Sequence, residues 1–330
     1  MARMTLTPRY SQPLSAMQPF ALLLDGPSVL IGRLRDETGW QGVGPFEVPI
    51  AVRGDGAVIF NFPATERFAG PIVRGYQPAY DERTPDDVIK AEKQRTAVGY
   101  ARLEYMNAWL AGYMAGMGTI QAHTIITPPP VDPLNHLKAR QVNGVWLVYD
   151  SKLIALSGSD EASPVNPGVF DHACNTMFAA ERTFGANFTA ALALFQQSSY
   201  QFRIHQFASA HLSAWSLSEQ VLNAMWKEYQ REASQGPDAW TAIPKKRREL
   251  LNGRDYTASV IAQTLSLAGK LPDERLGKLD QARRDRNDFA HSLAAINGDA
   301  AQNALTVASE MLSDLLAIRL SPQLSNTFWL

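Results

Sequence analysis

Cysteine is nearly absent from this sequence, and charged residues are scarce. Cys174 is the only cysteine, which excludes an internal disulfide framework and any zinc site built from several cysteines, and which fits a reducing cytosol. Charged residues make up 19% of the chain, and the formal net charge is -1. The chain as a whole is therefore not a basic nucleic-acid binder, so any contact with RNA must come from a local patch.

Long apolar runs, nucleotide-binding loops and metal-ligand clusters are also missing. The apolar run at 20–24 is far too short to span a bilayer, and residues 1–8 contain no stretch of signal-peptide length. No Walker-type or Gly-x-Gly-x-x-Gly loop occurs. His172 and Cys174 lie only two residues apart, which suits neither one helix face nor a complete metal site. We therefore expect a cytoplasmic protein with no membrane segment, no metal and no cofactor.

The first half of the chain alternates between strand, turn and helix signals. A length of 330 residues with 45% apolar side chains suggests two domains. Two pairs of β-rich runs, 47–53 with 57–62 and 140–142 with 145–149, flank Asp-Gly and Asn-Gly turns and predict hairpins. The segments 28–34 and 119–127 also look extended, and 84–117 predicts one long helix with a core-facing stripe from 105. The sequence thus predicts an α+β domain over 1–156, which senses a trigger or positions a substrate.

The second half reads as helices alone. The segment 157–168 is rich in Ser, Gly, Pro and acidic residues and is the best candidate linker. Beyond it the apolar periodicity predicts helices at 170–184, 187–200, 203–232, 256–268, 272–291 and 299–320. Asp299 is the expected cap of the last helix. We therefore predict an all-α bundle over 169–330.

The segment 276–293, LGKLDQARRDRNDFAHSL, carries the residues most suited to chemistry. Arginines interrupt its apolar stripe, and His291 lies near its end. Cleavage of RNA without a metal needs a base for the 2′-hydroxyl, an acid for the leaving oxygen and a fixed cation for the phosphorus centre. Histidine can serve as base or acid near neutral pH, and arginine binds phosphate with a planar fork.

Helical spacing decides which of these side chains share a face. Arg284, Asn287 and His291 are separated by three and four residues and therefore line up. Arg286 lies five residues before His291 and points away. Its long side chain, or an irregular helix end, would have to bring its guanidinium group back.

The pattern Arg286-Asn287-x3-His291 resembles the motif of the HEPN family, which includes ApeA-like members: an arginine followed by four to six residues and a histidine. Arg284 also satisfies this spacing. The resemblance covers about 169–320 and implies a HEPN-like helical bundle, a homodimer and an RNase site made by two facing motifs. It implies catalytic roles for Arg286, Asn287 and His291, with Arg284 as the alternative arginine. Many such RNases act in toxin–antitoxin or anti-phage systems and cut without metal.

A basic run follows Pro244 and is the candidate RNA-binding surface. From 245 to 291 the chain has eleven Lys or Arg against seven Asp or Glu, which suits an RNA-facing surface in an otherwise acidic protein. The candidate RNA-binding residues are Lys245, Lys246, Arg247, Arg248 and Arg283. A solvated loop is the alternative for the basic run, and surface ion pairs with Asp280, Asp285 or Asp288 are the alternative for Arg283 and Arg284.

Three classes of function remain open at this point, and the last of them is a structural dimerisation domain attached to an unknown activity of the N-terminal region. The first is a metal-independent endoribonuclease, a toxin or antiviral defence effector, with RNA as substrate and a regulatory protein or phage-derived trigger as a further partner. The second is a HEPN-like module that binds RNA or protein and dimerises without cutting. In that case His291 and Asn287 have structural roles at the helix end.

Overall fold

A computed structural model describes residues 28–30, 39–52, 57–63, 67–68, 85–117, 137–142, 145–150, 167–203, 205–234, 243–251, 253 and 256–322. The chain divides into two compact units, Met1–Phe178 and Ala179–Leu330, and each has its own buried core. Of the expected extended segment 28–34 only 28–30 is described, and the expected segment 119–127 and most of the expected linker 157–168 lie outside the described residues.

A six-stranded sheet forms the β part of the first unit, in the order β2-β3-β4-β1-β6-β5. The strands are β1 Ser28–Leu30, β2 Trp40–Gly44, β3 Val48–Val52, β4 Ala57–Phe60, β5 Leu137–Val142 and β6 Val145–Asp150, and a short 3-10 turn, η2 Pro45–Glu47, joins β2 to β3. Neighbouring strands are antiparallel except β1 and β6. Both expected hairpins, β3–β4 and β5–β6, are confirmed. β2 was not predicted, because two glycines interrupt its apolar pattern.

A long helix, α2 Pro85–Met117, packs on this sheet and confirms the helix expected at 84–117. Tyr105, Trp109 and Tyr113 of its apolar stripe are buried. The Phe60 ring on β4 meets Tyr105 and Trp109 edge-on, at 6.3 and 5.8 Å between ring centroids. The stripe is therefore the core of the first unit, as its period indicates.

The next helix, α4 Gly168–Phe184, begins in the first unit. Its Phe170 ring stacks on Trp109 and Tyr113, at 6.2 and 5.9 Å. A Cβ atom added to Gly112 would lie 2.9 Å from the Ala173 backbone, so only glycine allows α2 and α4 to approach this closely. Phe170 thus belongs to the core of the first unit, and the division between the two units falls inside α4, after Phe178.

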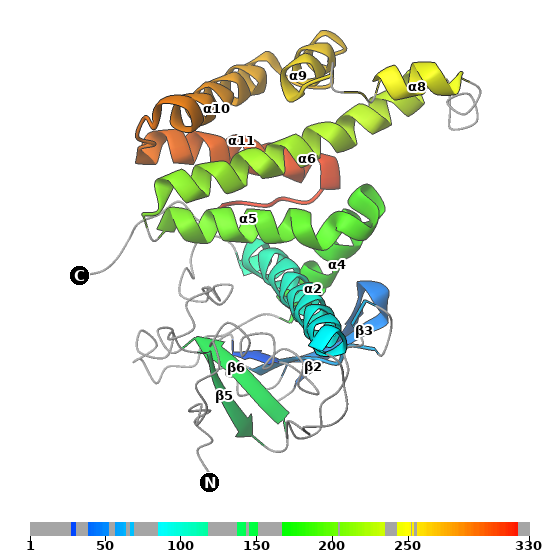
Figure 1. Ribbon diagram of the computed structural model, residues 1–330, viewed down its shortest axis with the longest axis vertical. Helices are drawn as coiled ribbons and strands as arrows, with labels where there is room; N and C mark the ends of the chain where they lie inside the picture. The colour runs from blue at the N-terminus through cyan, green and yellow to red at the C-terminus, as the bar shows by residue number, and fades with distance from the viewer. Residues whose placement is uncertain are drawn as a thin grey trace. The chain divides into compact units, whose positions relative to one another are not determined.

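The described part of the second unit is helical throughout. After a short 3-10 turn, η4 Gly185–Asn187, come α5 Phe188–Arg203, α6 Phe207–Ala233, α8 Lys245–Leu251, α9 Ala258–Leu267, α10 Asp273–Ser292 and α11 Gly298–Leu316. α6 packs against α5, α9, α10 and α11, and it runs between α5 and α10 in Figure 1. The expectation of an α+β region followed by a helical region is thus confirmed. No described helix is long and apolar enough to cross a membrane.

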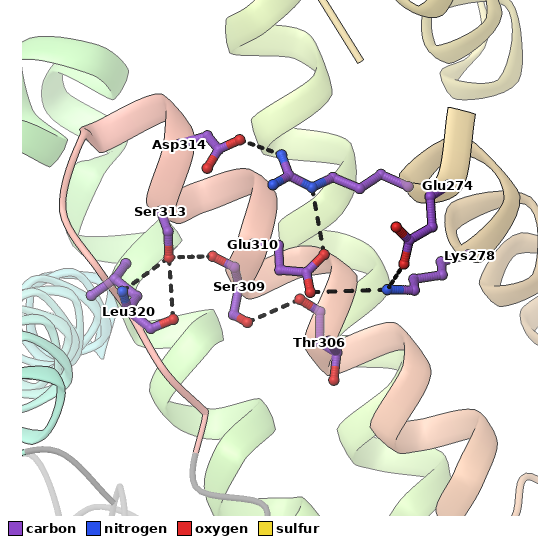
Figure 2. A network of polar contacts seen from close by, with 9 residues as sticks. Glu274, Lys278, Thr306, Ser309, Glu310, Ser313, Asp314 and Leu320 are labelled. Atoms are coloured by element: carbon purple, nitrogen blue, oxygen red, sulfur yellow. Dashed lines mark hydrogen bonds and ion pairs between the residues drawn. The ribbon is translucent and has the colours of Figure 1, made fainter. Parts of the chain in front are cut away.

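The last helix differs from the expectation at both ends. Asn297, not Asp299, is the cap: its Oδ1 accepts a hydrogen bond from the Ala300 backbone N–H at 2.9 Å. α11 ends at Leu316 rather than near Leu320, because Ala317 adopts the left-handed conformation. The chain then folds back, and the Leu320 N–H donates to Ser313 Oγ at 2.9 Å, as Figure 2 shows.

Candidate functional site

The candidate catalytic residues lie on the second half of α10. The helix follows Pro272, carries Asp273 in its first turn and packs through Leu279 and Ala282, which are both buried. It stays regular to Ser292. The irregular helix end that could have turned Arg286 toward His291 is therefore not present.

A regular helix puts Arg284, Asn287 and His291 on one face, as their spacing predicts. Arg286 has its Cα on the side of Leu279 and Ala282, because it follows these buried residues by seven and four positions. Its guanidinium group nevertheless reaches sideways and donates from Nη1 to Asn287 Oδ1 at 3.0 Å. The long side chain thus brings the Arg286 charge beside a residue of the His291 face.

Cations in the first half of α10 are paired with carboxylates. Arg275 forms ion pairs with Asp314 and, at 3.5 Å, with Glu310 of α11. Lys278 contacts Glu274 at 2.8 Å and Glu310 at 4.0 Å (Figure 2). These contacts link α10 to α11, so these two charges are engaged in holding the helices together.

The three arginines of the second half of α10 differ in the partners of their guanidinium groups. Arg283 contacts Asp280 at 3.5 Å between Nε and Oδ1. Arg284 donates from Nη2 to the amide oxygen of Gln281 at 2.9 Å, and Arg286 bonds to the amide oxygen of Asn287. Within the described part of the chain, neither Arg284 nor Arg286 has a carboxylate within ion-pair distance. Their charges are held in place by neutral acceptors and are not neutralised by them.

The end of α10 is open to solvent. The His291 side chain is exposed and forms no hydrogen bond or ion pair with another described residue. Phe289 is half-buried, and Leu293, which closes the helix in the left-handed conformation, is 83% exposed. The expected apolar stripe of α10 is therefore fully buried at Leu279 and Ala282, half-buried at Phe289 and exposed at Leu293.

The basic residues 245–248 form α8 rather than a loop, and they lie away from the motif. The Leu251 carbonyl at the end of α8 accepts hydrogen bonds from Trp226 and Gln230, near the C-terminal end of α6. The motif helix contacts α6 near the opposite end, at His211. Fifteen residues of helix separate His211 from Trp226, or about 22 Å at 1.5 Å per residue. One chain therefore does not gather 245–248 and the α10 arginines into a single small site.

The side chains of this basic run differ in exposure. Lys245, Lys246 and Arg247 are exposed and Arg248 is half-buried. Lys245 contacts Glu249 one turn later, at 3.7 Å. Lys246 and Arg247 therefore remain as the accessible cations of α8 for which the described structure records no ion pair.

Metal-binding groups are not found in the described part of the chain, where no three His, Cys, Asp or Glu side chains cluster. Cys174 is buried, and burial raises the pKa of its thiol to about 11. Such a thiol is almost fully protonated at neutral pH, so it is a poor nucleophile and a poor metal ligand.

The structural role of one buried histidine was not predicted from the sequence, where His211 was considered only as a metal ligand without a third partner. His211 on α6 is completely buried and contacts backbone carbonyls of both α10 and α11. Its position on the apolar face of a long helix was the available signal, because a buried histidine needs hydrogen-bond partners.

In comparisons with protein-family models, with curated proteins and with solved structures, the chain has no significant match.

Proposed function

We propose that this protein is a metal-independent endoribonuclease with its catalytic residues on the second half of α10. The observation that carries the proposal is the contrast along this helix. Arg275, Lys278 and Arg283 are paired with carboxylates, whereas Arg284 and Arg286, among the described residues, bond to neutral amides and to no carboxylate, beside an exposed histidine. Unneutralised arginines beside a free imidazole suit a phosphodiester substrate.

Each side chain has a distinct role in this proposal. His291 transfers a proton, as base toward the 2′-hydroxyl or as acid toward the leaving 5′-oxygen. Arg286 stabilises the negative charge that grows on the phosphoryl oxygens, and Asn287 fixes the direction of its guanidinium group. Arg284 binds the neighbouring phosphate. If the catalytic arginine must lie on the same helix face as His291, Arg284 takes the charge-stabilising role in place of Arg286.

The reaction requires both a base and an acid, and the exposed end of α10 offers one histidine. A second copy of the chain, related by a two-fold axis, supplies the second one. The 83% exposed Leu293 and the half-buried Phe289 lie beside His291 and are the apolar residues that such a contact would cover. We therefore propose a HEPN-like homodimer formed through the ends of α10. Light scattering of the Leu293→Asp variant tests this, and a monomeric wild-type protein under active conditions contradicts it.

The proposed setting is the cytoplasm, in toxin–antitoxin or antiviral defence. The α+β region of the first unit then senses a trigger, such as a regulatory protein or a phage-derived molecule, or positions the RNA. The accessible cations of α8, Lys246 and Arg247, contact RNA away from the cleaved bond. This division of roles follows from the separation of about 22 Å along α6, which is several nucleotides of extended RNA.

The second candidate is a protein-binding dimerisation module that does not cut RNA. One observation favours it: within 280–291, Asp280, Asp285 and Asp288 balance the three arginines, so the formal net charge of this stretch is zero with His291 counted as neutral. A balanced surface repels RNA less than an acidic one but attracts it weakly. Salt dependence separates the candidates, because RNA binding weakens steeply with salt while an apolar protein contact does not.

Alanine variants of α10 test the catalytic proposal. His291→Ala removes the proton transfer, and cleavage is expected to fall about 10²–10⁴-fold. Arg286→Ala removes a charge-stabilising donor, with an expected loss of about 10²–10³-fold. Arg283→Ala is the matched control, since Arg283 is paired with Asp280 on the same helix, and its expected loss is below about 5-fold. Equal losses for Arg283→Ala and Arg286→Ala, or full activity of His291→Ala, would contradict the proposal.

A further inference from the structure

His211 holds two backbone carbonyls that frame the proposed catalytic segment. Its Nε2 lies 3.0 Å from the Ala282 carbonyl oxygen on α10, and its Nδ1 lies 3.2 Å from the Ala300 carbonyl oxygen in the first turn of α11. The side chain is fully buried. Between the two carbonyls the chain passes through every candidate catalytic residue, from Arg284 to His291.

These contacts involve backbone positions that set the geometry of the candidate catalytic segment at both of its ends. The Ala282 carbonyl also accepts the helical hydrogen bond four residues on, from the Arg286 backbone N–H. The contact of the buried His211 ring with this carbonyl therefore acts on the turn from which the Arg286 side chain leaves. The Ala300 contact fixes the start of α11. The link 293–297 is therefore anchored three residues after its last residue, Asn297.

Both contacts use the same small ring. A neutral imidazole has one N–H and donates to one of the two carbonyls at a time, whereas the imidazolium ion donates to both. Leucine has a comparable size but can donate to neither. The burial of a ring with two polar atoms in a helical core is costly unless these carbonyls receive its hydrogens.

We propose that His211 is a positioning residue, which ties α10 and α11 to α6 at both ends of the segment 282–300 and so fixes the geometry of Arg286 and His291. The catalytic part of this inference rests on the proposed function, whereas the tie itself does not. His211 acts through the backbone and touches no substrate, so it affects turnover rather than RNA binding.

Three variants separate this role from ordinary core packing. His211→Leu keeps the apolar volume and removes both ring nitrogens. His211→Gln restores a side-chain amide that can reach one carbonyl. Asn303→Leu is the matched control, because Asn303 Nδ2 of α11 donates to the Lys278 carbonyl of α10 at 3.0 Å, outside the framed segment.

Hydrogen–deuterium exchange of the full chain is the first measurement. In His211→Leu we expect exchange in 283–300 to rise about 2- to 10-fold, the value of one hydrogen bond, with no change in α5. His211→Gln should recover part of this protection, and Asn303→Leu should leave 287–297 unchanged. Unchanged exchange in 283–300, or an equal rise in α5, would overturn the tie. If His211→Leu does not fold, exchange in 283–300 and in α5 is compared between His211→Gln and Asn303→Leu. A rise in 283–300 that is confined to His211→Gln supports the tie, and no difference between the two variants overturns it.

Cleavage kinetics are the second measurement. We expect kcat of His211→Leu to fall about 10- to 100-fold with KM unchanged, because misplacement of a catalytic group by about 1 Å costs this much, and we expect partial rescue by His211→Gln. Equal changes in kcat and KM, or the same loss in Asn303→Leu, would overturn the positioning role. If the wild-type chain cuts no RNA, the proposed function fails by itself, and the exchange data still decide whether the tie exists.

Discussion

Replacing the Asn287 amide by a carboxylate, in Asn287→Asp, should reduce cleavage by the proposed enzyme more than removing the side chain in Asn287→Ala. Arg286 Nη1 donates to Asn287 Oδ1 at 3.0 Å. Asn287→Asp keeps the size of this acceptor but turns it into a carboxylate, which forms an ion pair with Arg286. An RNA phosphate must then compete with this carboxylate for the guanidinium group.

The expected size of the effect follows from the geometry. Unit charges about 4 Å apart attract by about 1 kcal/mol in water and by about 4 kcal/mol at an effective dielectric constant of 20. Arg286 is half-buried, so a value of about 1–2 kcal/mol is appropriate, which corresponds to a loss of roughly 5- to 30-fold in cleavage. Asn287→Ala removes only one orienting hydrogen bond, and its expected loss is about 2- to 10-fold.

Single-turnover cleavage of RNA at two salt concentrations measures this. The Asn287→Asp defect should shrink as salt rises, since salt screens the new ion pair, while the Asn287→Ala defect should not. Gln281→Glu is the parallel variant for Arg284, whose Nη2 bonds to the Gln281 amide oxygen. The reasoning is refuted if Asn287→Asp cleaves faster than Asn287→Ala. A larger loss in Gln281→Glu would instead identify Arg284 as the charge-stabilising arginine.

Three further expectations concern reactivity and stability. The Cys174 thiol, with its pKa raised to about 11 by burial, should resist a thiol reagent at pH 8 until the protein is unfolded; rapid labelling of the native protein would contradict this burial. Burial lowers the pKa of His172 below 6.5, so the unfolded state binds more protons, and stability should fall as pH drops below 6.5; His172→Gln should flatten this dependence in acid unfolding curves, and an unchanged slope would count against it. Asn297→Ala removes the cap of α11 and should lower the free energy of unfolding by about 0.5–2 kcal/mol, whereas Asp299→Ala should change it less; the reverse order would restore Asp299 as the cap.

Local sequence signals predicted the elements well. The Asp-Gly and Asn-Gly turns marked both hairpins, and helical periodicity marked α2, α5, α6, α9 and α10 within a few residues. These signals are local, since they depend on turn conformation and on one buried face. β2 was missed because glycines interrupt its apolar pattern, although Gly42 is required by the Trp40 ring, where a Cβ atom would lie 2.4 Å away. Glycine weakens the strand signal even where packing requires it.

Contacts between distant residues could not be predicted in the same way. The tie from His211 to Ala282 and Ala300 joins backbone atoms 71 and 89 residues away, and any residue type offers a backbone carbonyl. Helical spacing placed Arg284, Asn287 and His291 on one face, but the sideways bond from Arg286 to Asn287 depends on a rotamer that spacing does not determine. The separation of α8 from α10 likewise depends on the length of α6.

The chemistry at the cleaved bond tests the central proposal most directly. A long RNA of mixed sequence is incubated with the full chain in excess EDTA, and the ends of the products are identified. The account predicts a 2′,3′-cyclic phosphate and a 5′-hydroxyl, with DNA of the same sequence uncut, because the 2′-hydroxyl is the nucleophile. Cleavage that EDTA abolishes, products with a 5′-phosphate, or cleavage of the DNA would contradict it.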